Sequence, residues 1–550
     1  MCYDFHRINT RQTYKDIMTE EERRELIRKK RRREAILRKR KIRRMKRIAF
    51  FSGCALLAVL IIILVVTLTK KDESSVKQTE ASESVLSELS SEDGTEASTD
   101  TGKDTASMSS DEGEVENTVS QDEVAADLSG LTADQQSVYA QAQRLAAMYD
   151  YDSAISLLQS QDGYDGISVY TEAVSDYEAE KAACVAVDVE TVSHIFFHSL
   201  LNDDRGFDPE VSGDFVAQDN GCWMCSVDEF NTILQQMYDH GCVLVRLRDL
   251  VVQTTDEDGD VHFEKNTSLM LPEGKQAVVL SEDDLSYYHA YDNQGIASKL
   301  VFDENGEVKC EYINEAGETL VGDYDMVPLL NAFIDEHPDF SYHNAHAIIA
   351  LTGYNGVFGY RTDSVYKTLD PDHLDENQAV WLEAHPEYSF EQDVADATEI
   401  ANALKEEGWE FASHTWGHRH ADTTSVEDLA VDNEKWVNTV ENIVGPVDTI
   451  IFAHGSDIAG DEDYDMDNAK YAYFKESGYN FFCNVDGTTP VWMQIRDDYV
   501  RSGRVNIDGY RLYQAMTGNE SAVADMEYLG IHDIESFFDY ARVTPVVIPE

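Results

Sequence analysis

Two clusters of ionisable residues have the types and spacing that hydrolytic chemistry needs. The first is the adjacent pair Asp283 and Asp284, and the second is the pair His414 and His418, four residues apart. Neighbouring carboxylates on an extended backbone point in different directions, so one can bind a metal while the other accepts a proton. One Asp and two His form a three-ligand set that leaves a coordination position open for water. The alternative is a solvated turn for the Asp pair and a polar loop for the His pair.

Each cluster follows a predicted strand, where a parallel sheet presents its chemistry. Strand and helix patterns alternate from about residue 185 onward, which is typical of a parallel sheet covered by helices. The predicted strands are 194–197, 242–245, 277–280, 346–351, 410–412, 449–452 and 481–485, and the predicted helices are 226–240, 326–336, 397–407, 426–444 and 468–477. A barrel and a doubly wound sheet both fit this order. Both bind substrates at the carboxyl ends of their strands, where the two clusters lie.

With the two clusters in this order, the chain resembles the NodB-type polysaccharide deacetylases. Leu280-Ser-Glu-Asp-Asp284 is similar to that family's Thr-Phe-Asp-Asp motif, and Ser413-His-Thr-Trp-Gly-His418 to its His-Ser/Thr-x-x-His motif. Ile195-Phe-Phe-His198 resembles the opening of the domain, and the resemblance covers about residues 185–512. It implies an α/β fold, a distorted (β/α) barrel with a divalent metal ion of the Zn²⁺ kind. The implied reaction removes acetyl groups from an N-acetylated cell-wall polysaccharide such as peptidoglycan.

The resemblance also implies roles for the two clusters. Asp284, His414 and His418 would hold the metal, and Asp283 would be the general base that takes the proton of the attacking water. The family's third motif, Arg-x-Pro-Tyr, reads Ala453-His-Gly-Ser456 in this chain, so the arginine that steadies the base is missing at that point.

Substitutes for the missing motifs come from nearby residues. The backbone N–H of Ser456 takes the place of the family's oxyanion donor. No clean Leu-x-His motif follows, so His454 at a strand end is the candidate general acid. Arg504 and Asp508 are predicted to bind substrate, or to orient the base or the acid. Trp416 is predicted to stack on a sugar, with core packing as the alternative.

Outside this region the chain is divided by composition. Residues 1–48 hold 19 Lys/Arg and 7 Asp/Glu, and residues 48–69 carry no charge, which predicts a transmembrane helix with the N-terminus in the cytoplasm. The alternative of a cleaved signal peptide does not fit so long and so late an apolar run. The predicted parts are a basic tail (1–47), the span (48–69), an acidic disordered linker (70–130), a helical spacer (131–184) and the catalytic domain (185–550), placed outside the plasma membrane.

Charge and cysteine content limit the other possibilities. A net charge of −61 excludes nucleic acid as a partner of the whole chain, and leaves the membrane and a wall polysaccharide as the predicted partners. Cys222 and Cys225 form a Cys-x-x-Cys that predicts a disulfide or an incidental pair rather than a zinc site. Two functions remain as alternatives to the N-deacetylase. One is a catalytically weak or inactive glycan-binding protein, and the other is an esterase that removes O-acetyl groups from wall polysaccharide.

Overall fold

A computed structural model describes residues 128–549, apart from 258, 370–372 and 461. The predicted basic tail, the span 48–69 and the linker up to residue 127 lie outside the described residues. None of the helices in the described part is both long and apolar enough to cross a membrane. The predicted single-pass location in the plasma membrane is therefore not supported by the described residues, and it is not carried further. Residues Val124–Glu550 form one compact unit.

The centre of this unit is a closed barrel of seven parallel strands. In spatial order they are β11 (Ile348–Leu351), β12 (Glu410–Ser413), β13 (Thr449–Ile451), β14 (Phe481–Val485), β16 (Val500–Asn506), β2 (Ser193–His198) and β7 (Gln276–Asp283). Pairing of Ile348 with Ser281 joins β11 back to β7 and closes the ring. The short strand β3 (Cys242–Leu244) pairs with the first residues of the same β7 edge. Closure decides between the two predicted architectures in favour of a distorted barrel.

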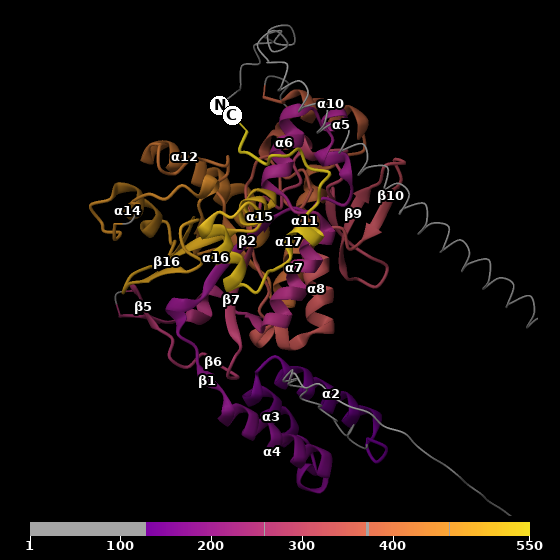
Figure 1. The fold of residues 1–550 in the computed structure, drawn as a ribbon, viewed down its shortest axis with the longest axis vertical. Coiled ribbons are helices and arrows are strands. Elements are labelled where there is room, and N and C mark those ends of the chain that lie inside the picture. Colours follow the sequence, from indigo (N-terminus) through magenta and orange to yellow (C-terminus); the bar gives the residue numbers. More distant parts are fainter. Residues whose placement is uncertain (1–127, 258, 370–372, 461, 550) are drawn as a thin grey trace, which may run out of the picture. The chain divides into compact units, whose positions relative to one another are not determined.

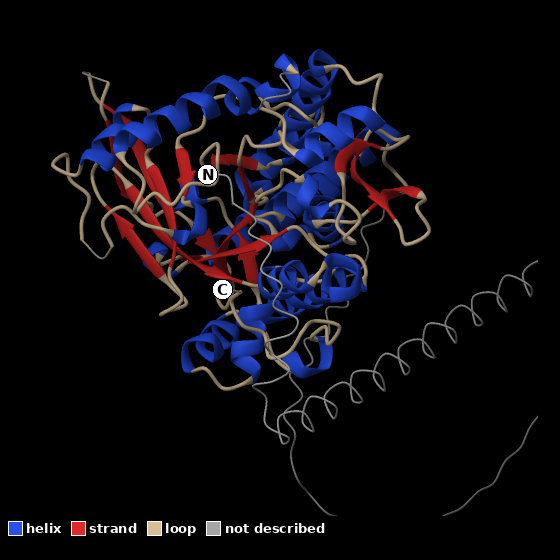
Figure 2. Ribbon diagram, turned by 90° about the horizontal axis from the view of Figure 1, so that it is seen from above, coloured by secondary structure: helices blue, strands red, loops and turns tan. Residues whose placement is uncertain are grey.

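Helices pack around the strands (Figure 2). Those that follow barrel strands are α7 (Val227–His240), α8 (Met326–Glu336), α11 (Phe390–Glu407), α12 (Val426–Trp436), α14 (Ala469–Glu476) and α15 (Gly509–Met516). Local chemistry sets the limits of α7: the Ser226 side chain and Glu229 form a capping box at its start, and Gly241 ends it with φ 94°. Helix α12 continues through a π-helical turn, Val437–Glu441, into α13 (Asn442–Val444), so the predicted helix 426–444 is present with one irregular turn.

Several elements were not expected from the sequence. The strand β7 runs on to Asp283, although the acidic run after Leu280 predicted its end. The barrel strand β16 was missed because Arg501, Gly503 and Arg504 are typical of a loop. The other elements are β1 (Val185–Ala186), β4 (Val251–Thr255), β5 (Val261–Lys265), β6 (Met270–Leu271), β8 (Lys299–Phe302), β9 (Val308–Ile313), β10 (Thr319–Gly322), β15 (Trp492–Ile495), α5 (Pro209–Ser212), α6 (Asp214–Trp223), α9 (Ser364–Thr368), α10 (Glu376–Ala384), α16 (Glu520–Tyr528) and α17 (Ile534–Phe537).

Three helices precede the barrel: α2 (Ala133–Ala147), α3 (Tyr151–Gln159) and α4 (Ser168–Ala183), which lie together in Figure 1. Their buried side chains share one apolar cluster with residues from the barrel interior. The hydroxyl of Tyr149 donates to the carbonyl of Asp339 over 2.7 Å. The predicted helical spacer is therefore packed directly on the barrel.

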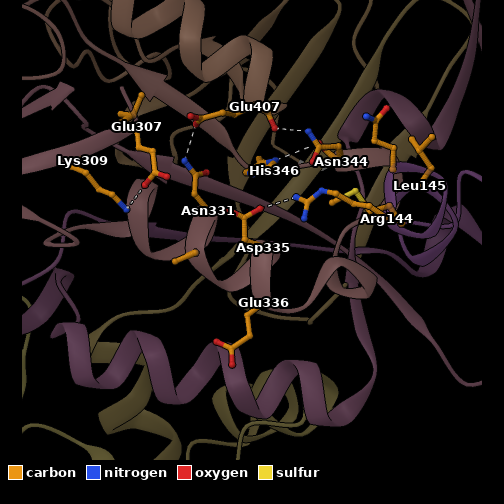
Figure 3. Close-up of a pocket in the computed structure, with 14 residues that line it drawn as sticks. Arg144, Leu145, Glu307, Lys309, Asn331, Asp335, Glu336, Asn344, His346 and Glu407 are labelled. Atoms are coloured by element: carbon orange, nitrogen blue, oxygen red, sulfur yellow. Dashed lines mark hydrogen bonds and ion pairs between the residues drawn. The ribbon is translucent and has the colours of Figure 1, made fainter. Parts of the chain in front are cut away.

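A cavity of about 860 Å³ lies where α2 meets α8 and the end of α11. Its polar side chains largely bond to one another: Arg144 pairs with Asp335 over 2.7 Å, and Asn331 donates to Glu407 over 2.7 Å (Figure 3). His346, another lining residue, precedes β11, whereas the two predicted clusters lie at the carboxyl ends of their strands. This cavity is thus at the opposite end of the barrel from the predicted chemistry.

A buried acid pair on the outside of the barrel gives a prediction about pH. Glu282 is fully buried, and neither carboxyl oxygen has a hydrogen-bond partner among the described residues. Burial, with the charges of Asp325 and Asp283, raises the pKa of Glu282 well above its usual value of 4.5. Burial also raises the pKa of Asp325, which caps α8, from 3.8 to about 6. A carboxyl with a raised folded-state pKa binds more protons when folded, so its contribution to stability is present at low pH and is lost as the pH rises.

We expect Glu282→Gln to become more stable relative to the natural chain as the pH rises from about 4.5 to 7.5, by at least about 1 kcal/mol. Glutamine keeps the shape of the side chain and has no proton to lose. The measurement is the free energy of unfolding in urea at both pH values. A difference between the two proteins that stays constant with pH would contradict the prediction.

Candidate metal and catalytic site

The structure brings the two predicted clusters together at the carboxyl ends of β7 and β12. One ligand atom from each of Asp284, His414 and His418 lies within 4.8 Å of the other two. The Nε2 atom of His418 is 3.5 Å from Oδ2 of Asp284. Two imidazoles and one carboxylate are the donor set of a hydrolytic metal centre, so the residues present fit a divalent ion. The predicted metal-binding group is therefore present.

Backbone contacts prepare His414 for that role. Its Nδ1 atom lies 2.8 Å from the carbonyl oxygen of Ile451, at the end of β13. A carbonyl can only accept, so Nδ1 carries the proton and the lone pair is on Nε2. That nitrogen faces the carboxylates, 3.9 Å from Oδ2 of Asp283. Fixing the tautomer through a backbone carbonyl is a usual arrangement for metal-binding histidines.

The backbone is strained at this point of the molecule. Asp284, Thr415, His418 and His454 all have φ between 50° and 64°. Such left-handed conformations are uncommon for residues other than glycine, and each costs of order 1 kcal/mol. Strained residues persist where the surrounding structure holds them, and they concentrate at functional sites. Their clustering here is independent support for a functional site.

Asp283 is held by an arginine from a different strand than the resemblance suggested. Arg504 on β16 donates from Nη1 to Oδ1 over 2.7 Å and from Nη2 to Oδ2 over 2.8 Å. Burial would raise the pKa of Asp283, but the charge of Arg504 and its hydrogen bonds lower it well below its usual range. The carboxylate is therefore ionised and fixed in orientation. Arg504 supplies the contact that Ala453 cannot make, and because it is fully buried its contacts favour the second predicted role, orienting the base, over substrate binding.

A polar chain inside the barrel holds Arg504 in turn. Nη1 of Arg504 also lies 3.1 Å from the hydroxyl of Ser281. The fully buried His194 places one ring nitrogen 3.1 Å from Ser281 and the other 3.1 Å from Ser502. Burial, together with the charge of Arg504, lowers the pKa of His194 well below 6.5, so this imidazole is neutral. These residues were missed, although their positions on β2, β7 and β16 alternate as inward-facing residues of a strand do.

Two residues predicted to bind substrate make contacts within the protein instead. Asp508 caps α15 by accepting from the backbone N–H of Arg511 over 2.7 Å, and it also accepts from Asn506 over 2.7 Å. The Trp416 ring has the ammonium group of Lys435 4.5 Å from its centre. A side chain at Gly353 would meet the same ring at 2.1 Å, so the backbone there lies against the indole. The structure places Asp508 as a helix cap and Trp416 as a packed side chain.

Ser456 and His454, which were predicted to replace groups of the missing motifs, also make contacts within the protein. The backbone N–H of Ser456, predicted as the oxyanion donor, points to the carbonyl of Ala453 over 3.3 Å. Nε2 of His454 lies 3.2 Å from the carbonyl of His418, and its ring stacks on His420 with centres 3.7 Å apart. Burial and the charges of His418 and His420 lower the pKa of His454 to about 4. Neither residue is arranged for its predicted role. The N–H of Ser456 is directed at a carbonyl of its own loop, and a neutral, stacked imidazole such as that of His454 is a poor proton donor at neutral pH.

Three further side chains border the site and were not assigned from the sequence. His198 on β2 pairs in register with Asp283, and its Nδ1 atom donates to the carbonyl of Trp223 over 3.1 Å. Tyr288 donates its hydroxyl to Oδ1 of Asp284 over 2.6 Å and also contacts the hydroxyl of Thr352. His198 could have been found by its place at the end of a strand. Tyr288 lies in a loop without periodicity, so the sequence offers no such signal.

The Cys-x-x-Cys pair forms no disulfide. Cys222 and Cys225 are both free and fully buried, which contradicts a disulfide between them. Burial raises the pKa of each thiol, so both are protonated. A buried pair of neutral thiols agrees with the incidental alternative.

The metal-binding assignment can be tested on the purified chain. We expect His414→Ala and His418→Ala each to lower the affinity for Zn²⁺ steeply, because three protein ligands leave none to spare. His420→Ala, two residues beyond the ligand pair, is the matched control and should keep the natural affinity. The measurement is metal affinity by competition with a chelator. Unchanged affinity in both ligand variants would mean that the two histidines form only a polar loop.

Comparisons with known proteins add little. Searches against protein-family models and against curated proteins found no match. Among solved structures, the chain is similar to the Streptococcus pyogenes deacetylase PplD in complex with acetate, at 11% sequence identity. The alignment covers 62% of this chain and 97% of that one, with a TM-score of 0.30. So low a score carries no argument, and the proposals below depend on the geometry of the site.

Proposed function

We propose that this protein is a metal-dependent hydrolase that removes acetyl groups from an N-acetylated polysaccharide of the cell-wall kind, such as peptidoglycan. One observation carries the proposal. Asp284, His414 and His418 converge beside an ionised carboxylate, Asp283, at the carboxyl ends of the strands of a closed parallel barrel. In barrels of this kind catalytic residues come from those strand ends.

Each residue has a role that follows from its contacts. Asp284, His414 and His418 would hold Zn²⁺ or a similar ion, with His414 presenting Nε2 because its other nitrogen is bonded to Ile451. When bound, such an ion polarises an acyl carbonyl and makes water acidic enough to act as a nucleophile at neutral pH. Asp283, held ionised by Arg504, accepts the proton of the attacking water.

The leaving nitrogen also needs a proton, and Asp283 is the nearest group that has just gained one. Contacts with Arg504 lower the pKa of Asp283, which weakens it as a base and strengthens it as an acid once protonated. We propose that the same carboxyl returns the proton as the carbon–nitrogen bond breaks, so that acetate and a free amine leave. This assignment replaces His454 as the general acid.

The inactive, glycan-binding alternative rested on two absences, the arginine that steadies the base and a clean Leu-x-His motif. Arg504 makes the arginine's contact from β16, which supports the enzyme over this alternative. The esterase alternative uses the same groups and differs only in the atom that leaves.

Acetate release from matched glycans is the test. The purified chain, loaded with Zn²⁺, is incubated with N-acetylated wall glycan and with glycan that carries only O-acetyl groups. We expect release from the first substrate. Release from the second alone would make the protein an esterase, and release from neither, with Zn²⁺ still bound, would favour the glycan-binding alternative.

A further inference from the structure

Tyr288 lies against Asp284 in a way that the proposed reaction does not use. Its hydroxyl is 2.6 Å from Oδ1 of Asp284 and also in contact with the hydroxyl of Thr352. The hydroxyl of Thr352 is in turn 3.1 Å from that of Ser286. Ser286 and Thr352 are fully buried, so these hydroxyls depend on one another for their hydrogen bonds.

The direction of these hydrogen bonds follows from the chemistry of the Asp284 carboxylate, at which they end. An ionised carboxylate has no proton and can only accept, so Tyr288 donates to Asp284. Each hydroxyl has one proton, so Thr352 then donates to Tyr288, and Ser286 to Thr352. Hydrogen bonds aligned in one direction strengthen one another.

This arrangement leaves the two oxygens of Asp284 in different positions. Oδ1 is taken by Tyr288, whereas Oδ2 lies 3.5 Å from Nε2 of His418, on the side of the other two candidate ligands. We propose that Tyr288, supported by Thr352 and Ser286, is a positioning residue that turns Asp284 so that it offers one oxygen, Oδ2, to the metal. The inference rests on the proposed metal site. Tyr288 would hold Asp284 in place through the oxygen that does not face the metal, as the Ile451 carbonyl holds His414 through Nδ1.

The inference predicts a specific pattern of Zn²⁺ affinities in the full-length chain. Tyr288→Phe removes the donated hydrogen bond and keeps the ring, and we expect it to weaken Zn²⁺ binding about 10–100-fold, as loss of an outer partner usually does. Thr352→Val removes only the upstream donor and should weaken binding less. Tyr291→Phe is the matched control, because its ring packs 5.7 Å from that of Tyr288 and no hydrogen bond of its hydroxyl is seen among the described residues. It should bind Zn²⁺ as the natural chain does.

Metal affinity is measured by competition with a chelator, without any substrate, so the result does not depend on turnover. Affinity of Tyr288→Phe within about twofold of the natural chain, which itself binds Zn²⁺, would overturn the inference and leave the proposed function in place. Equal losses in Tyr288→Phe and Tyr291→Phe would also overturn it, because the ring environment would then be responsible. No Zn²⁺ binding by the natural chain would overturn the proposed metal site and this inference with it. If Tyr288→Phe does not fold, Thr352→Val decides: a loss of affinity supports the inference and none overturns it.

Discussion

Asp283→Asn is expected to lower the rate of acetate release about 10²–10⁴-fold and to leave the amount of bound metal unchanged. An amide has almost the shape of a carboxylate but cannot accept the proton of the attacking water. The substitution keeps one oxygen that can accept from Arg504, so the orientation of the side chain is largely kept. Metal content should be preserved because the proposed ligands are Asp284, His414 and His418.

The neighbouring acid provides a control for this prediction. Glu282 precedes Asp283 on β7 and faces the opposite side of the strand, toward Asp325 and the outer helices. Glu282→Gln should therefore keep its acetate release, although it carries the same chemical change one residue away. The measurement is acetate released per metal-loaded protein. Equal, non-zero rates for Asp283→Asn and the natural chain would remove Asp283 from the mechanism.

Helix limits that depend on local sequence could be predicted, and so could the two polar clusters at the strand ends. Capping residues such as Ser226 and Gly241 limit a helix wherever it packs, and the structure shows α7 between them. The pairs Asp283–Asp284 and His414–His418 were selected because each follows a predicted strand, and the ends of parallel strands meet at one end of a barrel. The family resemblance then assigned Asp284 and the two histidines to the metal and Asp283 to the proton.

Contacts that depend on barrel closure could not be predicted in detail, although orientation of the base was among the roles predicted for Arg504. Arg504 and Asp283 are 221 residues apart, and they meet only because β16 pairs with β2 and β2 with β7. An arginine in a short run with glycine is typical of a loop, whereas here the barrel interior supplies a carboxylate and a serine that satisfy it. No arginine stands at the position of Ala453, because the guanidinium of Arg504 reaches Asp283 from another strand.

Removal of Arg504 is expected to have the second large effect, on stability as well as on turnover. The guanidinium is fully buried and Asp283 is 3% exposed, so Arg504→Met leaves a carboxylate in the barrel without its partner. Breaking one side of a buried ion pair usually costs about 3–5 kcal/mol of unfolding free energy, because the remaining charge is desolvated and uncompensated. Lysine at this position keeps the charge but cannot bind both oxygens in the same plane, so Arg504→Lys should lose less stability than Arg504→Met.

The double variant Asp283→Asn with Arg504→Met separates the charge effect from lost packing. With no carboxylate left to compensate, it should recover much of the stability that Arg504→Met loses, while remaining inactive. Recovery will be incomplete, because Arg504 also donates to Ser281 over 3.1 Å and packs 4.1 Å from the centre of the Phe196 ring. The measurement is urea unfolding, at pH 7 and without metal, of the natural chain, the two single variants Asp283→Asn and Arg504→Met, and the double variant. Acetate release is measured on the same proteins loaded with metal. Equal stability of Arg504→Met and the double variant would mean that Asp283 does not depend on Arg504 for its charge, and the assignment of Arg504 as the residue that positions the base would fail.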